Sequence, residues 1–400
     1  MLRRPAILVA AAAVMAGCSS PAPVAPPAAP TLDEGAAVLA IGELGAALTA
    51  QSSPGDTTGD TTGEQAVDDA VAGARSLGVT VERLRFLDED PTLTATLPRG
   101  RFAAVADLAW RVDGFDRKPA RAEVTVLLEQ RDGDTRIVGF GGGDRPDPLW
   151  LTGPLTVRRT AGVVVAGEDA QVVERVFGLT QRASTSVAAT LGQPVRVVVE
   201  VPASAADLDR TLGADEGQYA AIAAVTAPVG KDRGPRTPVH VFVNPEVLGG
   251  LSQHGAQLVM THEVAHLATD AVHAQSPLWL LEGYADHVAL RGTPLPLTRT
   301  AGQIGARVRK DGVPEALPAA TEFGAHAAHL GAVYEGAWRV VEVLVAARGE
   351  ATMHALYRRT AAGEPVDTAL RALYGFGEEE LTRRWQDDLR RIAALRPGAR

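Results

Sequence analysis

The sequence is poor in cysteine, in long apolar runs and in clustered positive charge. Its only cysteine, Cys18, has no partner for a disulfide bond within the chain, so packing, with or without a bound metal, must hold the fold. Beyond the N-terminus no apolar stretch is long enough to cross a bilayer, which predicts a water-soluble mature chain. The formal net charge of -9 and the lack of a run rich in lysine and arginine argue against nucleic acid or an anionic membrane surface as the main partner.

The length and composition of the chain are those of a globular protein with more than one domain. Its 46% hydrophobic and 22% charged residues are typical of soluble folds. Because 400 residues exceed what one hydrophobic core usually organises, we expect two domains in addition to any targeting segment.

The first 18 residues have the pattern of an export signal. Arg3 and Arg4 form a basic start, residues 5–16 are almost wholly apolar, and the run ends in Met15-Ala-Gly-Cys18. This ending resembles the lipobox of bacterial lipoproteins, in which the cysteine becomes the lipidated first residue after cleavage, although that family prefers leucine where Met15 stands. The resemblance implies a lipid anchor at Cys18 on the outer face of the bacterial cytoplasmic membrane. An ordinary secretory signal with an incidental cysteine is the alternative, and both interpretations predict export.

A spacer and a small α+β domain are predicted for residues 19–150. The proline-rich segment 19–31 favours an extended spacer. Apolar residues with helical spacing predict helices at 32–50 and 66–77, on either side of a Gly/Ser/Thr/Asp tract at 51–65 that predicts a loop. Strand patterns follow at 79–87, 102–112, 121–130 and 135–140. Two helices and a four-stranded meander predict an α+β domain over 32–150, whose topology resembles cystatin-like or NTF2-like domains without any catalytic cluster.

Residues 151–400 are predicted to form a second domain with strands first and helices afterwards. Strands are expected at about 155–166, 195–201, 219–226 and 239–243, with an amphipathic helix at 168–191 after the first of them. Helices are expected at 251–269, 277–290, 326–347, 351–361 and 378–394. The domain should therefore combine a mixed sheet with a mostly helical part.

One predicted helix contains the pattern His-Glu-x-x-His. His262 and His266 lie four residues apart, so on a helix both imidazoles face the same way and can bind one tetrahedral metal ion, with metal–nitrogen distances of about 2.0 to 2.1 Å. Glu263 is next in the turn and can reach a metal-bound water. A catalytic zinc site needs a third protein ligand and one open position, so a further donor is expected elsewhere in the chain.

A second motif supplies a candidate for that donor. The segment from Pro277 to Asp286 reads Pro-Leu-Trp-Leu-Leu-Glu-Gly-Tyr-Ala-Asp. Together with His-Glu-x-x-His it resembles the zinc-binding part of the peptidase MA-like gluzincins, the zincin-like relatives of thermolysin and of the M1 aminopeptidases. The resemblance implies one zinc ion held by His262, His266 and Glu282. It also implies that Asp286, one turn after Glu282, accepts a hydrogen bond from a liganding imidazole.

The same resemblance implies the chemistry of a zinc metallopeptidase. Glu263 is implied as the general base on the zinc-bound water, and a tyrosine in a later helix as the donor to the oxyanion. Tyr334 is the first candidate for that tyrosine, with His329 and His326 as alternatives. A tyrosine that only packs on the helix is an equally open interpretation.

The motifs bear on the substrate as well. The M1 aminopeptidases carry a Gly-x-Met-Glu-Asn strand that captures a free N-terminus, and the strand at 239–243 lacks it. The 15 residues between His266 and Glu282 are also fewer than in that family. We therefore expect an endopeptidase of the cell envelope that binds a peptide or protein substrate along an edge strand at 239–243. A non-catalytic zincin-like lipoprotein that holds an envelope partner is the alternative function.

Overall fold

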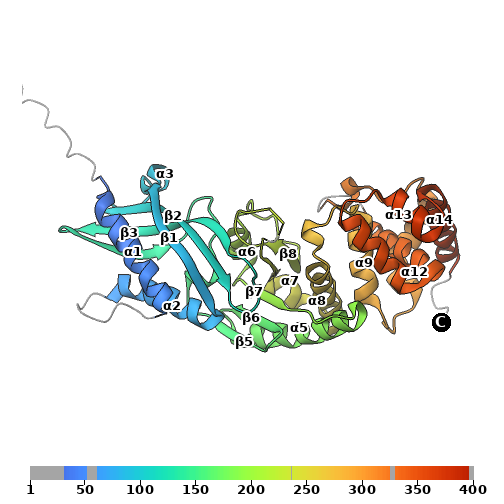
Figure 1. The fold of residues 1–400 in the computed structure, drawn as a ribbon, viewed down its shortest axis with the longest axis horizontal. Helices are drawn as coiled ribbons and strands as arrows, with labels where there is room; N and C mark the ends of the chain where they lie inside the picture. The colour runs from blue at the N-terminus through green and yellow to red at the C-terminus, as the bar shows by residue number, and fades with distance from the viewer. Residues whose placement is uncertain (1–30, 52–60, 236, 325–328, 396–400) are drawn as a thin grey trace, which may run out of the picture. The chain divides into compact units, whose positions relative to one another are not determined.

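The chain folds into two β-sheets followed by a mostly helical C-terminal part (Figure 1). The computed structural model describes residues 31–51, 61–235, 237–324 and 329–395. Cys18, nearly all of the predicted spacer and His326 lie outside these residues, so what the sequence predicts for them stays a prediction. The first sheet ends at Phe140 and the second begins at Thr156. The proposed division into two domains at about residue 150 also stays a prediction.

An antiparallel sheet in the order β1-β2-β3-β4, with two helices against it, forms the N-terminal part. The helices are α1 (Glu34–Ala50) and α2 (Thr61–Leu77), and the strands are β1 (Val79–Glu89), β2 (Arg101–Val112), β3 (Ala120–Arg131) and β4 (Asp134–Phe140). The short helix α3 (Pro91–Thr94) follows β1. The predicted helices and strands are confirmed, except that α2 begins at Thr61 and takes up the end of the predicted loop. Alternate residues of β3 from Ala122 to Leu128 are buried beneath the helices because strand side chains alternate between the two faces.

The second sheet is mixed and has the order β5-β6-β7-β9-β8. Its strands are β5 (Thr156–Arg159), β6 (Val163–Gly167), β7 (Val197–Val201), β8 (Ala224–Pro228) and β9 (Val239–Val243). Strands β6, β7 and β9 are parallel, while β5 and β8 run antiparallel at the two ends. Two sequence predictions are therefore wrong. The strand at 239–243 lies inside the sheet and not at its edge, and the strand predicted at 219–226 begins only at Ala224.

Both faces of this second sheet are buried, which explains the continuous valine runs in its strands. Val163 and Val165 of β6 pack with the helices, whereas Val164 and Ala166 of the same strand pack with the core of the first sheet. In β9, Phe242 likewise joins the core of the first sheet, and its two neighbours join the helical core. A strand covered on both faces needs apolar residues at every position, so the usual alternation disappears.

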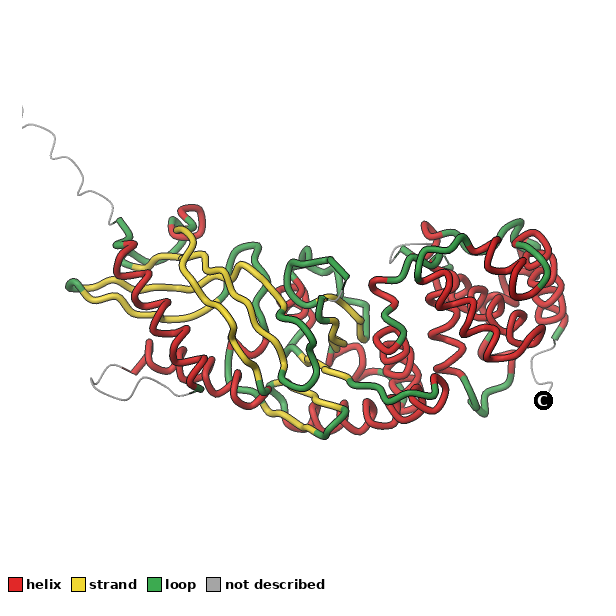
Figure 2. The backbone as a smooth tube through the Cα atoms, viewed as in Figure 1, coloured by secondary structure: helices red, strands yellow, loops and turns green. Residues whose placement is uncertain are grey.

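Helices lie before and between the strands of the second sheet and form most of the chain after it (Figure 2). Those that position the site are α5 (Ala170–Leu191), α8 (Gln253–Ala268), α9 (Leu278–Leu290) and α12 (Leu330–Ala361). The others are α4 (Leu149–Thr152), α6 (Ala205–Leu212), α7 (Pro245–Gly250), α10 (Leu297–Thr300), α11 (Gly302–Asp311), α13 (Val366–Tyr374) and α14 (Glu378–Ala394). Helix α12 covers most of two predicted helices, and Gly349, with φ 77° and ψ 171°, interrupts it between them. A glycine tolerates this backbone conformation, which L side chains rarely adopt.

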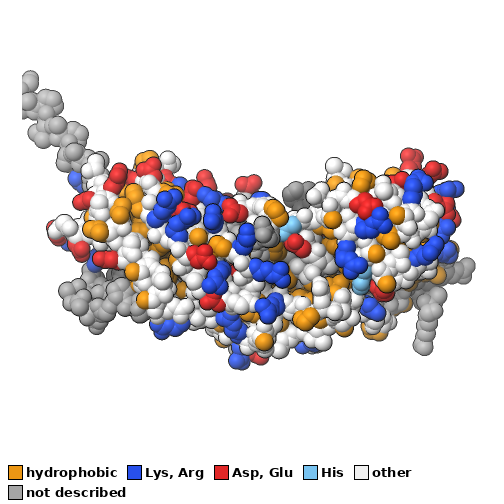
Figure 3. Space-filling model, viewed as in Figure 1, with side chains coloured by type: hydrophobic (Ala, Val, Ile, Leu, Met, Phe, Trp, Pro, Cys, Tyr) orange, Lys and Arg blue, Asp and Glu red, His pale blue; other side chains and the backbone are white. Residues whose placement is uncertain are grey.

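Within the described residues, no helix combines the length and apolar character that crossing a bilayer requires. Basic and acidic side chains are interspersed over the visible face of the molecule (Figure 3).

Candidate metal centre

Helix α8 carries the two histidines of the His-Glu-x-x-His motif. Ser252 caps its start by accepting a hydrogen bond from the amide of Gly255 at 3.1 Å. One side of the helix, which includes Met260 and Val264, is buried in the core. His262 and His266 project from another side, where the spacing of four residues puts their rings 4.5 Å apart between centroids.

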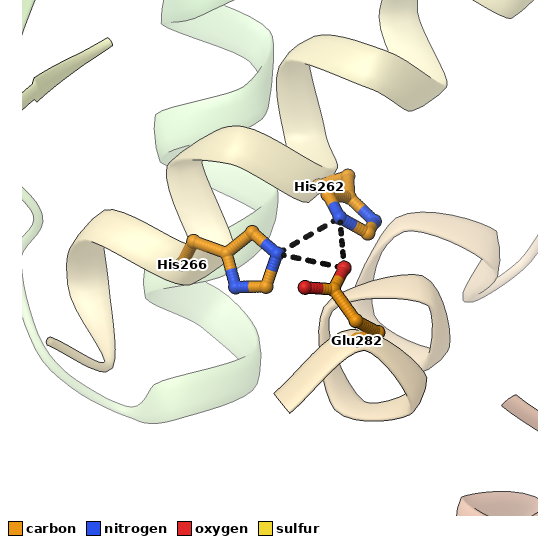
Figure 4. Close-up of side chains that lie close together, drawn as sticks. All are labelled: His262, His266 and Glu282. Atoms are coloured by element: carbon orange, nitrogen blue, oxygen red, sulfur yellow. Dashed lines mark hydrogen bonds and ion pairs between the residues drawn. The ribbon is translucent and has the colours of Figure 1, made fainter. Parts of the chain in front are cut away.

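Helix α9 brings Glu282 to the same point in space (Figure 4). The Nε2 atoms of His262 and His266 are 2.9 Å apart, and Oε2 of Glu282 lies 3.2 Å from each of them. All three side chains are largely shielded from solvent. In the part of the chain that the structure describes, this is the one group of three metal-ligating side chains that converge in this way.

The donor set fits a zinc ion. Ligand atoms about 2.0 to 2.1 Å from a tetrahedral zinc lie about 3.3 Å from one another, close to the separations found here. Three electron-rich atoms that face one another at this distance repel each other unless a positive charge sits between them. Two imidazole nitrogens with one carboxylate oxygen also leave a fourth position of the tetrahedron open.

Asp286 orients one of the two imidazoles. Its Oδ1 atom lies 2.8 Å from Nδ1 of His262, so Nδ1 donates to it and the other ring nitrogen, Nε2, faces the cluster. Burial alone lowers the pKa of His262, but the carboxylates of Asp286 and Glu282 outweigh burial and hold that pKa well above its usual value. Burial raises the pKa of Glu282, but the hydrogen bonds with the two histidines outweigh burial and lower that pKa. The electrostatics of the site therefore favour a cation.

Glu263 lies beside the three converging donors but is not one of them. Its Oε2 atom accepts a hydrogen bond of 2.7 Å from the hydroxyl of Thr226, which belongs to strand β8. The same hydroxyl lies 2.9 Å from the main-chain oxygen of Glu263. Thr226 could not be predicted as part of the site, because no local sequence pattern shows which strand lies next to helix α8.

Tyr334 lies near the histidines, whereas His329 is at the exposed start of its helix. The ring centroids of Tyr334 and His262 are 6.3 Å apart, and Phe323 packs edge-on against the tyrosine. Burial and, after it, the charges of Glu282 and the neighbouring carboxylates raise the pKa of Tyr334, so its phenol stays protonated and able to donate. His329 caps α12 in a left-handed conformation with φ 63°.

Gly283, next to Glu282, allows helices α9 and α12 to approach closely. A Cβ atom at this position would lie 2.3 Å from the carbonyl oxygen of Ala337. Ala337 follows Tyr334 by about one helical turn, so this approach also brings Tyr334 toward the three converging side chains. This packing role of Gly283 was not predicted, although a glycine inside a predicted helix is a signal of close approach.

Two other histidines lie in buried polar clusters of a different kind. His240 of β9 lies between Glu200 of β7, at 2.7 Å from Nδ1, and Asp116 of the loop after β2, at 3.1 Å from Nε2. His287 of α9 lies between two glutamates of α12. Both nitrogens of each ring are occupied by carboxylates, which leaves no lone pair for a metal ion.

Comparison with known proteins finds a family match for the helical part of the chain. The model of the Peptidase MA superfamily matches residues 250–391, which run from the end of α7 into α14. No curated protein matches the sequence. The match supports a peptidase MA-like fold for this segment, and it includes every residue of the converging cluster.

Proposed function

We propose that the chain is a zinc-dependent metallopeptidase that hydrolyses internal peptide bonds at the bacterial cell envelope. The convergence of His262, His266 and Glu282 carries this proposal, because two helices bring three ligand atoms together and leave a fourth position open. The match to the Peptidase MA superfamily over residues 250–391 supports it independently of the geometry.

The side chains around the cluster are those that hydrolysis of a peptide bond requires in addition to the metal. Zinc, when bound, acts as a Lewis acid that acidifies water and polarises the scissile carbonyl. Glu263 takes the proton of the attacking water and later gives it to the leaving amine. The phenol of Tyr334 donates to the carbonyl oxygen as negative charge develops on it. Asp286 holds the His262 ring in the orientation that points Nε2 into the cluster.

The free edge of β8 provides a place for the substrate main chain. Asn244 donates to the carbonyl of Ala223, and Val229 donates to that of Pro238, so the odd-numbered residues of β8 bond to β9. The main-chain groups of Ala224 and Thr226 therefore point away from β9, toward the open side of the sheet. An extended peptide added there would run past Glu263, which favours cleavage inside a chain.

The location at the cell envelope depends on Cys18. The basic start, the apolar run and the lipobox-like ending support lipid attachment at this residue, which would leave the catalytic part outside the cytoplasmic membrane. Mass spectrometry of the mature N-terminus tests this part separately. A mature chain that begins elsewhere and carries no lipid would contradict the anchor without affecting the proposed chemistry.

The central experiment joins metal analysis to cleavage profiling. The purified full-length chain should contain one zinc per molecule and cleave internal bonds in an unbiased peptide library. A chelator should abolish cleavage, and added zinc should restore it. A chain that holds stoichiometric zinc but cleaves no peptide would contradict the hydrolytic function and favour a binding role.

A further inference from the structure

Thr226 is in direct contact with the proposed general base, but it comes from a different part of the fold. It lies on β8, the terminal strand of the second sheet, while Glu263 lies on α8. The hydroxyl approaches Oε2 of Glu263 to 2.7 Å and the main-chain oxygen of the same residue to 2.9 Å. Since a hydroxyl has one hydrogen, it donates to one acceptor at a time, and an ionised carboxylate is the stronger of the two.

The contact restricts the Glu263 carboxylate. A hydrogen bond to Oε2 fixes the rotation of the carboxylate and engages one of its two oxygens, so Oε1 is left to accept a proton. Both residues are only half-buried, which leaves room for water beside them. A freely rotating glutamate would spend part of its time in orientations that cannot reach the attacking water.

Thr226 also has a second connection to the reaction through its main chain. Its N–H and C=O, like those of Ala224, point away from β9 and toward the free edge of the sheet. Among the described residues, no main-chain group from outside the sheet forms a hydrogen bond with either group. One residue therefore offers its main chain to an incoming extended peptide and its side chain to the base.

We infer that Thr226 is a positioning residue, which holds the Glu263 carboxylate through its hydroxyl and ties the orientation of the base to the strand that receives the substrate. The inference rests on the proposed peptidase function. It assigns to β8 a role in catalysis as well as a role in binding.

Kinetics of three variants of the full-length, zinc-loaded chain test the role. Thr226→Val keeps the shape of the side chain and removes the hydroxyl. We expect kcat to fall by about 10- to 100-fold, the range of a lost hydrogen bond to a charged group, with KM within about 3-fold of wild type. Thr226→Ser restores the hydroxyl and should bring kcat back to within about 3-fold of wild type. Thr180→Val is the matched control, because it removes a buried hydroxyl that bonds within α5, to Val176.

A double-mutant cycle tests the contact without any need for hydrolysis. The urea midpoint is measured for wild type, Thr226→Val, Glu263→Gln and the double variant. The changes caused by the two single substitutions should not add up in the double variant, because the two side chains interact directly. Thr226→Ala replaces Thr226→Val if the valine variant does not fold.

The outcomes separate this inference from the proposed function. If the wild-type chain hydrolyses peptides and Thr226→Val keeps full kcat, or Thr226→Ser shows the same loss as Thr226→Val, the positioning role is overturned while the peptidase stands. Additive urea midpoints would also overturn it. If the zinc-loaded wild type cleaves nothing, the proposed function fails and the catalytic role of Thr226 fails with it, whatever the cycle shows about the contact.

Discussion

Two of the buried histidine–carboxylate clusters among the described residues are made of similar side chains and differ in what they can bind. At the first, His262, His266 and Glu282 point one atom each at a common centre. At the second, His240 donates from both nitrogens, to Glu200 and to Asp116. The first cluster is built by two adjacent helices, and the second lies between the two sheets.

The difference lies in what the ring nitrogens face. In the His240 cluster the ring is protonated on both nitrogens and donates a hydrogen bond to each carboxylate. The imidazolium ring is therefore the positive charge of this cluster. Burial lowers the pKa of His240, but Asp116 and Glu200 outweigh it and raise that pKa to about 10. In the His262 cluster the carboxylate of Asp286 takes the outer nitrogen, and the inner nitrogens still face a shared point. Residue composition alone therefore does not identify a metal site; the arrangement of donors does.

Removing Glu282 should have the largest effect and test the comparison most directly. Glu282→Ala leaves two imidazoles, so we expect zinc to be lost on dialysis and hydrolysis to disappear with it. Asp286→Ala should weaken metal binding only by about 10- to 100-fold, because Asp286 acts through His262. Glu200→Gln in the other cluster is the matched control and should keep full zinc. Metal content after dialysis is the measurement, and stoichiometric zinc in Glu282→Ala would show that the third ligand lies elsewhere.

Glu263→Gln should retain zinc and lose most of the hydrolysis. The side chain is expected to move a proton without binding the metal, so kcat should fall by roughly 10²- to 10⁴-fold at unchanged metal content. Zinc and turnover need to be measured on the same preparation. Near-normal turnover in a zinc-loaded variant would remove Glu263 from the mechanism.

Gly283→Ala tests whether close packing of α9 on α12 holds the cluster together. Alanine favours a helix over glycine by about 1 kcal/mol, but a Cβ atom would lie 2.3 Å from the carbonyl oxygen of Ala337. The main chain cannot yield as a flexible side chain can, so we expect a net loss of about 1 to 3 kcal/mol in the free energy of unfolding. Gly302→Ala, where a Cβ meets nothing within 4 Å, is the control and should be neutral or stabilising. Equal stability of the two variants would contradict the packing argument.

The pH dependence of stability should report the charge held in the His240 cluster. Since the pKa of His240 is raised to about 10, the folded chain keeps a proton that the unfolded chain releases near 6.5. The stabilisation is complete below about 6.5 and is lost as the pH rises through about 10. Within this window the free energy of unfolding should fall by at most about 1.4 kcal/mol per pH unit from this group. Urea unfolding of wild type and His240→Gln across this range measures it, and identical slopes would mean that His240 is not charged in the folded chain.

The local features of this protein could be predicted from its sequence. Apolar periodicity predicted the helices and strands of the first sheet and helices α8 and α9, because these patterns depend on residues close together in the chain. The spacing of His262 and His266 is likewise a property of one helix. A motif resemblance placed Glu282 and Asp286 with them, and their functional roles stay predictions.

The identity of the strand at the edge of the second sheet could not be predicted in this way. The strand at 239–243 and β8 are both five residues long, and their order in the sheet depends on pairing between distant segments, which periodicity does not encode. For the same reason the contact between Thr226 and Glu263, which are 37 residues apart, could not be predicted from the sequence. The difference between the two histidine clusters could not be predicted either, because Asp116 and His240 are 124 residues apart and meet only when the two sheets pack together.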